Sequence, residues 1–143
     1  MLKTGAIVLS TWSALNALPS LGILFLVLCR DGNAPGFTTS LTEAQIAGLP
    51  LEVLAAANSV ALYANGLNVA LSVLFVACIW NGLVHGVKWV FWAISAAATL
   101  TVLAGIGGDY LVGTRHPEVN LISLALVAVG AGCSARGLFG SSR

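Results

Sequence analysis

Asp109 is the residue whose type and position best suit chemistry, because it is the only acid close to a face of an apolar segment. An ionisable group at such a place is costly unless it is paired or functional, so it marks a candidate site for a proton or a cation. Arg115 and His116 follow it, the first as a counter-ion and the second as an acid–base helper. Each also has a structural explanation: Asp109 as a solvated loop acid after Gly107 and Gly108, and His116 as a water-facing residue before Pro117.

Asparagines form a second group, because several of them interrupt apolar segments at helical spacing. With about 100° per residue, three of them fall on one face of the second apolar segment. Packing alone explains such residues, since amides join membrane helices by hydrogen bonds of about 0.6 kcal/mol and up to 1–2 kcal/mol. The functional alternative is a polar seam that opens outward and binds a ligand or conducts a solute. The candidate binding residues are Asn16, Asn58, Asn65, Asn68, Asp109, Arg115, His116 and Asn120.

No further constellation points to metal or redox chemistry. Cys29, Cys78 and Cys133 are odd in number and lack the paired spacing of a disulfide framework or a zinc site. His85 and His116 fall at opposite ends of the apolar segments, which disfavours a pair of haem ligands. We therefore predict no metal, no cofactor and no assigned catalytic residue, and we expect the cysteines to act as small apolar packing residues.

The composition identifies the environment in which these residues must work. The chain has 143 residues, of which 58% are hydrophobic and 8% are charged, and its mean hydropathy is +0.96. Soluble domains carry about 25% charged residues. Six basic residues against five acidic ones provide no basic footprint for nucleic acid. The composition predicts an integral membrane protein with membrane lipids as partners and no nucleic-acid partner.

Four apolar stretches are long enough to cross the hydrocarbon core, which takes about 20 helical residues. They run over approximately 4–29, 51–80, 87–107 and 118–138, and none has a charged residue in its central part. The sequence therefore predicts an all-α protein, an integral membrane four-helix bundle in one domain over 1–143. Small residues at every fourth position predict close helix contacts. They are Ala93, Ala97, Thr101 and Gly105, and separately Ala128 and Gly132.

Prolines and acids mark where the helices begin. Pro50 and Pro117 suit a first helical position, where the missing N–H costs nothing. Glu52 and Glu118 follow in the first turns, where a carboxylate favours the helix dipole. Pro19, inside the first stretch, predicts a kink unless a neighbouring group satisfies the freed carbonyl.

The connection between the first two stretches contains a turn-rich loop at 30–36 and a second helical signal. Ser40 and Glu43 match a capping box, which predicts a short surface helix over 41–47 in the first outer loop. The first stretch is longer than the apolar part of a cleaved signal peptide, about 7–15 residues, so we expect it to be retained.

Basic residues predict the orientation. Lys and Arg gather on the cytoplasmic side of membrane proteins. One side holds Lys3, Lys88, Arg136 and Arg143, and the other holds Arg30 and Arg115. Both termini and the loop at 81–86 are therefore expected in the cytoplasm, with Trp80, Trp89 and Trp92 at the inner interface and the protein in a bacterial inner membrane.

Three functional hypotheses follow. The first is a protein that binds a lipid, a hydrophobic small molecule or a partner membrane subunit through its polar seam. The second is a transporter or channel for a small solute or ion along the asparagines, working as a homo-oligomer. The third is a membrane-embedded enzyme acting on a lipid or sterol through Asp109, with His116 as helper. The missing catalytic constellation favours the first hypothesis and leaves enzymatic activity undecided.

Overall fold

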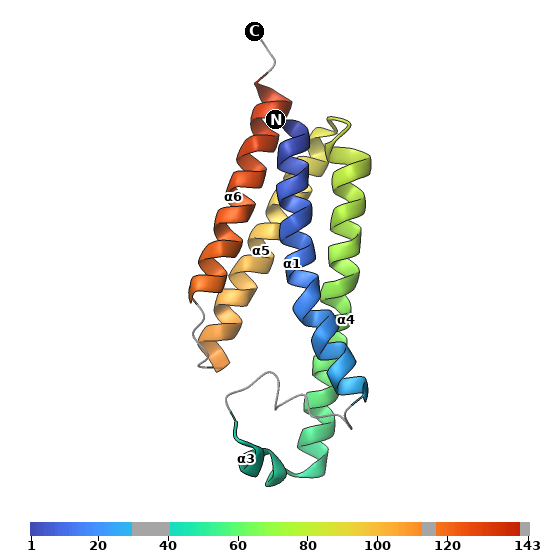
Figure 1. The fold of residues 1–143 in the computed structure, drawn as a ribbon, viewed down its shortest axis with the longest axis vertical. Coiled ribbons are helices and arrows are strands. Elements are labelled where there is room, and N and C mark those ends of the chain that lie inside the picture. Colours follow the sequence, from blue (N-terminus) through green and yellow to red (C-terminus); the bar gives the residue numbers. More distant parts are fainter. Residues whose placement is uncertain (30–40, 113–116, 141–143) are drawn as a thin grey trace. The chain divides into compact units, whose positions relative to one another are not determined.

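The computed structural model describes residues 1–29, 41–112 and 117–140, and all regular structure in these ranges is helical (Figure 1). Four helices are long and apolar enough to cross a membrane. The chain is thus a multi-pass membrane protein, and the predicted all-α four-helix bundle is confirmed. The elements are α1 (Leu2–Cys29), α3 (Glu43–Ala47), α4 (Leu51–Cys78), the π-helix η1 (Ile79–Leu83), α5 (Lys88–Val112) and α6 (Pro117–Phe139).

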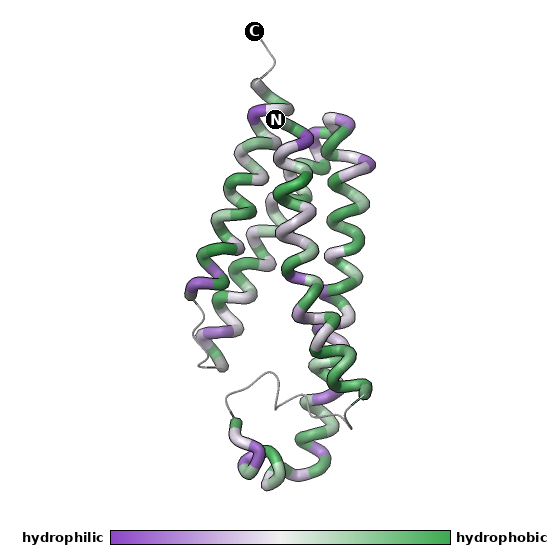
Figure 2. Tube along the Cα trace, in the orientation of Figure 1, coloured by the Kyte–Doolittle hydropathy of each residue, from purple (hydrophilic) through white to green (hydrophobic). Residues whose placement is uncertain are grey.

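Apolar residues follow the long helices through most of their length (Figure 2). In hydrocarbon no water is available to bond the backbone N–H and C=O groups at a helix end. Continuing the helix therefore costs less free energy than ending it. This explains why α5 passes through Gly107 and Gly108 and ends at Val112, whereas the sequence predicted an end near 107. It also explains why α1 contains Pro19. The kink predicted at Pro19 stays a prediction.

The described residues form two compact units, which we treat separately: Met1–Ala14 with Ser72–Arg143, and Leu15–Leu71. The first contains parts of all four long helices and is called the bundle unit below. The second contains the rest of α1, the start of α4 and α3, and is called the hairpin unit. The prediction of a single domain stays a prediction.

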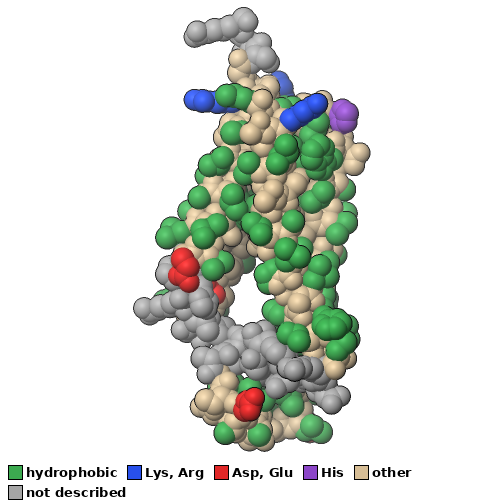
Figure 3. All heavy atoms as spheres, in the orientation of Figure 1, with side chains coloured by type: hydrophobic (Ala, Val, Ile, Leu, Met, Phe, Trp, Pro, Cys, Tyr) green, Lys and Arg blue, Asp and Glu red, His purple; other side chains and the backbone are tan. Residues whose placement is uncertain are grey.

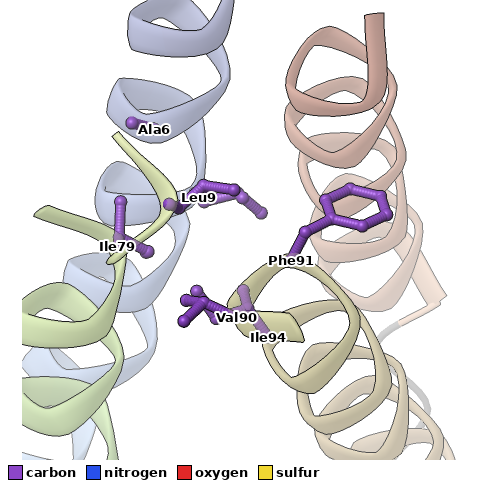
Figure 4. Packing of buried hydrophobic residues seen from close by; sticks show 7 residues of the cluster. Ala6, Leu9, Ile79, Val90, Phe91 and Ile94 are labelled. Atoms are coloured by element: carbon purple, nitrogen blue, oxygen red, sulfur yellow. The ribbon is translucent and has the colours of Figure 1, made fainter. Parts of the chain in front are cut away.

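Two clusters of buried apolar side chains hold the bundle unit together. The first combines residues of α1, η1 and α5, six of which are labelled in Figure 4. The second contains Trp12, Ala98, Val102 and Val127. The Trp12 ring meets that of Phe75 edge to face, with 5.9 Å between centroids. The members of the first cluster are Ala6, Leu9, Ile79, Leu83, Val90, Phe91 and Ile94.

Helices α1 and α6 cross at glycines. A Cβ atom added to Gly5 would lie 2.7 Å from both the carbonyl oxygen of Gly130 and the backbone nitrogen of Ser134. A Cβ on Gly137 would lie 2.7 Å from the backbone nitrogen of Leu2. Small residues allow this close approach of helix backbones. The prediction that Gly132 forms such a contact is wrong, since nothing lies within 4 Å of its added Cβ.

The end of α4 differs from the predicted loop at 81–86. Residues 79–83 are π-helical, and the chain turns only at 84–86. Gly86 has a φ of 79°, a backbone conformation that glycine adopts without steric cost. The side chain of Val90 packs against Gly82, 2.7 Å from the position of an added Cβ, so α5 begins directly beside the π-helix.

In the hairpin unit, Val27 and Ala61 are buried against Ile23 and Leu62, which joins α1 to α4. The short helix α3 exists, but it begins at Glu43. Its capping box is formed by Thr42 and Gln45: the Gln45 N–H donates to the Thr42 hydroxyl, and the Thr42 N–H donates to Gln45 Oε1 at 2.8 Å. Ser40, the capping residue predicted from the sequence, lies outside the described residues. The same sequence pattern occurs twice, two residues apart, and the later copy caps the helix.

The other predicted helix starts agree with the structure to two residues. Helix α6 begins at Pro117, as predicted. Helix α4 begins at Leu51, and the Pro50 carbonyl accepts the N–H of Leu54 at 3.1 Å. Pro50 is therefore the capping residue and not the first helical one. Glu52 and Glu118 lie in the first turns, as expected.

Candidate functional site

Asp109 and Asn120 form a polar pair between the neighbouring helices α5 and α6 of the bundle unit. The Asn120 amide donates to Asp109 Oδ2 at 2.8 Å. Asn120 Oδ1 lies over Gly105, 3.3 Å from the position of an added Cβ, so a larger side chain at Gly105 would crowd the amide. Both partners are half-buried. Two of the residues predicted to bind a ligand are therefore brought into direct contact.

Asp109 lies in the last turn of α5, and Tyr110 follows it in the same helix. The structural explanation of Asp109 as a loop acid is therefore wrong. The longer helix carries Asp109 about 32 Å along the axis from Lys88, at about 1.5 Å per residue. Because the hydrocarbon core is about 30 Å thick, the pair falls close to the interface opposite Lys88.

The pair has more capacity to accept hydrogen bonds than to donate them. An ionised carboxylate offers about four acceptor positions and no donor. The Asn120 donation engages one carboxylate oxygen, which leaves Asp109 Oδ1 and the amide oxygen as acceptors. No cation among the described residues forms an ion pair with Asp109. What the arrangement can do chemically is accept hydrogen bonds from a cationic group.

Apolar side chains surround this pair along α5 and α6. Tyr110 and Leu111 are 77% and 85% exposed, and Val119 and Leu121 are exposed on α6. Figure 3 shows acidic side chains at this end of the bundle unit beside apolar ones. The pair is thus a small polar spot within an apolar surface.

Asn68 joins α4 to α1 in the hairpin unit. Its amide donates to Ser20 Oγ at 2.8 Å and to the Asn16 carbonyl at 3.2 Å. Pro19 lacks the N–H that would bond the Leu15 carbonyl. The Asn68 donation goes to the next carbonyl along the helix, that of Asn16. Asn16, Ser20 and Asn68 therefore meet at one place, and interhelical hydrogen bonds account for their contact.

The remaining asparagines of α4 behave differently from Asn68. The Asn65 amide donates to the Ala61 carbonyl of its own helix at 2.8 Å, so it joins no second helix. Asn58 is half-buried on α4. Arg115 and His116 lie outside the described residues, and their predicted roles stay predictions.

Aromatic and basic residues gather at the opposite end of the bundle unit. The Lys88 ammonium lies 5.5 Å above the centroid of the Phe139 ring. Phe91 meets Phe139 and Trp92 edge to face, with centroids 5.8 Å and 5.2 Å apart. The tryptophans at this end could be predicted from the sequence, but Phe139 could not, because its only signal is its place one turn after Arg136.

Cys29 and Cys78 are exposed and Cys133 is half-buried, all three as free thiols. The expectation that the cysteines pack internally is wrong for Cys29 and Cys78, because both occupy outward faces of apolar helices. Within the described ranges, no three His, Cys, Asp or Glu side chains are grouped so that they could hold a metal ion. No protein-family model, no curated protein and no solved structure matches this chain.

Proposed function

We propose that this small polytopic membrane protein binds an amphiphile with a cationic, hydrogen-bond-donating head, either a lipid or a hydrophobic small molecule, at the Asp109–Asn120 pair. The observation that carries the proposal is the 2.8 Å bond between the two side chains. It fixes the carboxylate at the ends of two helices and leaves Asp109 Oδ1 and Asn120 Oδ1 as acceptors without a donor among the described residues. The head binds these acceptors, and the apolar part lies along the exposed side chains of α5 and α6.

The charge of Asp109 supports a cationic ligand more than a neutral one. Hydrogen bonds to a charged group contribute about 1.5–3 kcal/mol, about twice the value for neutral partners. An ammonium head satisfies the carboxylate and its charge together. A hydroxyl head of the same length satisfies only the hydrogen bond.

The asparagines support binding over conduction. A polar path needs amides that can exchange their partners with a passing solute. The Asn68 amide is instead engaged by Ser20 and the Asn16 carbonyl, and the Asn65 amide by its own helix. These bonds favour a structural role for the hairpin unit and leave Asp109 and Asn120 as the binding residues.

We place the protein in a bacterial inner membrane with the Lys88 end of the bundle unit in the cytoplasm. Lys3, Lys88 and Arg136 belong to this end, and Asp109 and Glu118 belong to the other. The excess of Lys and Arg supports this orientation. The Asp109–Asn120 pair then faces outward.

Binding of a fluorescent dodecylammonium probe tests the proposal, with the protein in phosphatidylcholine nanodiscs. Asp109→Asn removes the charge but keeps an oxygen that can accept the Asn120 bond, so the fold is retained. We expect its affinity for the probe to fall about tenfold or more, which corresponds to about 1.4 kcal/mol or more. A dodecanol probe of equal length should bind weakly to both proteins.

Glu118→Gln is the matched control, because it removes the same charge from the first turn of the neighbouring helix α6. Its affinity for the ammonium probe should stay near that of the unchanged protein. Equal losses in the two variants would show diffuse electrostatic attraction and reject the pair as the site. An unchanged affinity of Asp109→Asn would reject it directly.

A further inference from the structure

We propose that the Lys88 end of the bundle unit binds the anionic headgroups of phospholipids. The surface, called the basic end below, consists of Lys3, Lys88 and Arg136 with the aromatic side chains of Trp92 and Phe139. It differs from the proposed amphiphile site in its residues, in the sign of its charge and in its place at the other end of α5. The two proposals can therefore fail separately.

Cations from three helices belong to the end of the bundle unit that contains the last turn of α6. Leu2, which precedes Lys3, packs directly against Gly137, and Gly137 follows Arg136. Lys88 approaches the same turn from α5, with its ammonium 5.5 Å from the Phe139 centroid. Figure 3 shows the basic side chains and the described histidine at this one end.

The charges of the basic end lack acidic partners. Lys3, Lys88 and Arg136 are exposed, and none of them forms an ion pair with a described residue. The described acids of the bundle unit, Asp109 and Glu118, belong to the far ends of α5 and α6. Three like charges held together repel each other, and bound anions relieve that repulsion.

The aromatic cluster sets the depth at which the cations lie. Phe91, Trp92 and Phe139 pack edge to face or tilted, and Trp92 is 65% exposed. Exposed tryptophans prefer the headgroup level of a bilayer. Lys88, lying over Phe139, is thereby placed at the level of the lipid phosphates. Trp92 and Phe139 provide aromatic neighbours at the membrane interface, and the three cations have no acidic partner among the described residues. This combination fits an anionic phospholipid better than a soluble anion, which needs no apolar neighbour.

The test measures the preference of the protein for spin-labelled phosphatidylglycerol over spin-labelled phosphatidylcholine in reconstituted vesicles. Each cation near an anionic surface contributes about a fivefold factor. We expect Lys88→Gln to lower the preference by up to about fivefold, and the variant with Lys3, Lys88 and Arg136 all changed to Gln to show almost none. Higher salt should lower the preference of the unchanged protein, because exposed charges are screened.

Two control variants separate charge from structure. Lys88→Arg keeps the charge and should keep the preference. Asp109→Asn removes the carboxylate that the proposed amphiphile site needs, and it should leave the preference for phosphatidylglycerol unchanged. A preference that survives in the triple Gln variant, or that does not respond to salt, would overturn the proposal. All three cations are exposed, so replacing them should not unfold the protein. The helical circular dichroism of each variant checks this.

Discussion

The glycine crossing between α1 and α6 allows a stability prediction in which one variant controls for the other. Gly5→Ala places a methyl group 2.7 Å from the Gly130 carbonyl oxygen and the Ser134 nitrogen, both backbone atoms that cannot rotate away. The helices must therefore separate. Gly132→Ala makes the same chemical change on α6, where nothing lies within 4 Å of the new methyl group.

The expected difference in the free energy of unfolding follows from comparing these two variants. Alanine gains up to about 1 kcal/mol over glycine in a helix, and this gain is common to both variants. Overpacking costs about 1–3 kcal/mol and applies to Gly5→Ala alone. We expect the free energy of unfolding of Gly5→Ala to be about 1–3 kcal/mol below that of Gly132→Ala, measured by reversible unfolding in bicelles.

Ser134→Ala tests whether the backbone of α6 or the Ser134 hydroxyl causes the loss of stability in Gly5→Ala. The Ser134 hydroxyl is buried beside Gly5 and has no hydrogen-bond partner in the described part of the chain, so removing it alone should be neutral or slightly stabilising. In the double variant with Gly5→Ala the backbone contacts remain, and most of the destabilisation should persist. Equal stability of Gly5→Ala and Gly132→Ala, or full recovery in the double variant, would refute the close crossing.

Two further predictions concern hydrogen bonds that join α1 to α4 and to η1. Asn68→Leu removes the donations to Ser20 and the Asn16 carbonyl and should lower the free energy of unfolding by about 0.6–1.7 kcal/mol. Asn65→Leu should lower it less, because the Asn65 hydrogen bond stays within one helix. Equal losses in the same bicelle assay would contradict the assigned partners. Trp80→Phe removes the 3.1 Å donation from Trp80 Nε1 to Ser10 Oγ and should cost about 0.5–1.5 kcal/mol, while Trp80→Phe in a Ser10→Ala background should cost clearly less.

The positions of the four helices could be predicted from the sequence because hydrocarbon thickness and composition leave few alternatives. Pro117 marks the start of α6 because a proline at that place loses no hydrogen bond. The end of α5 could not be predicted in this way. Gly107 and Gly108 are typical helix ends in water, but in hydrocarbon their backbone groups have no alternative partner, and the helix continues.

The sequence predicts Asp109 and Asn120 as members of the candidate site, but it does not predict the hydrogen bond between them. Residue type and depth selected Asp109 and Asn120, whose contact depends on the extra turn of α5. The same limit applies to the glycines. The spacing of small residues selected Gly132, whereas Gly130 is the glycine that α6 turns toward Leu9 of α1.

The crossing of α1 and α6 joins elements that are synthesised first and last. At about 5–20 residues per second, the ribosome needs on the order of ten seconds between Gly5 and Ser134. During this time α1 can already bond to α4 through Ser13 and Ser72, while its glycine face remains against lipid. We therefore expect bundle closure to be the final assembly step, and a chain released before α6 to display a small-residue face that membrane proteases can use to recognise incomplete protein.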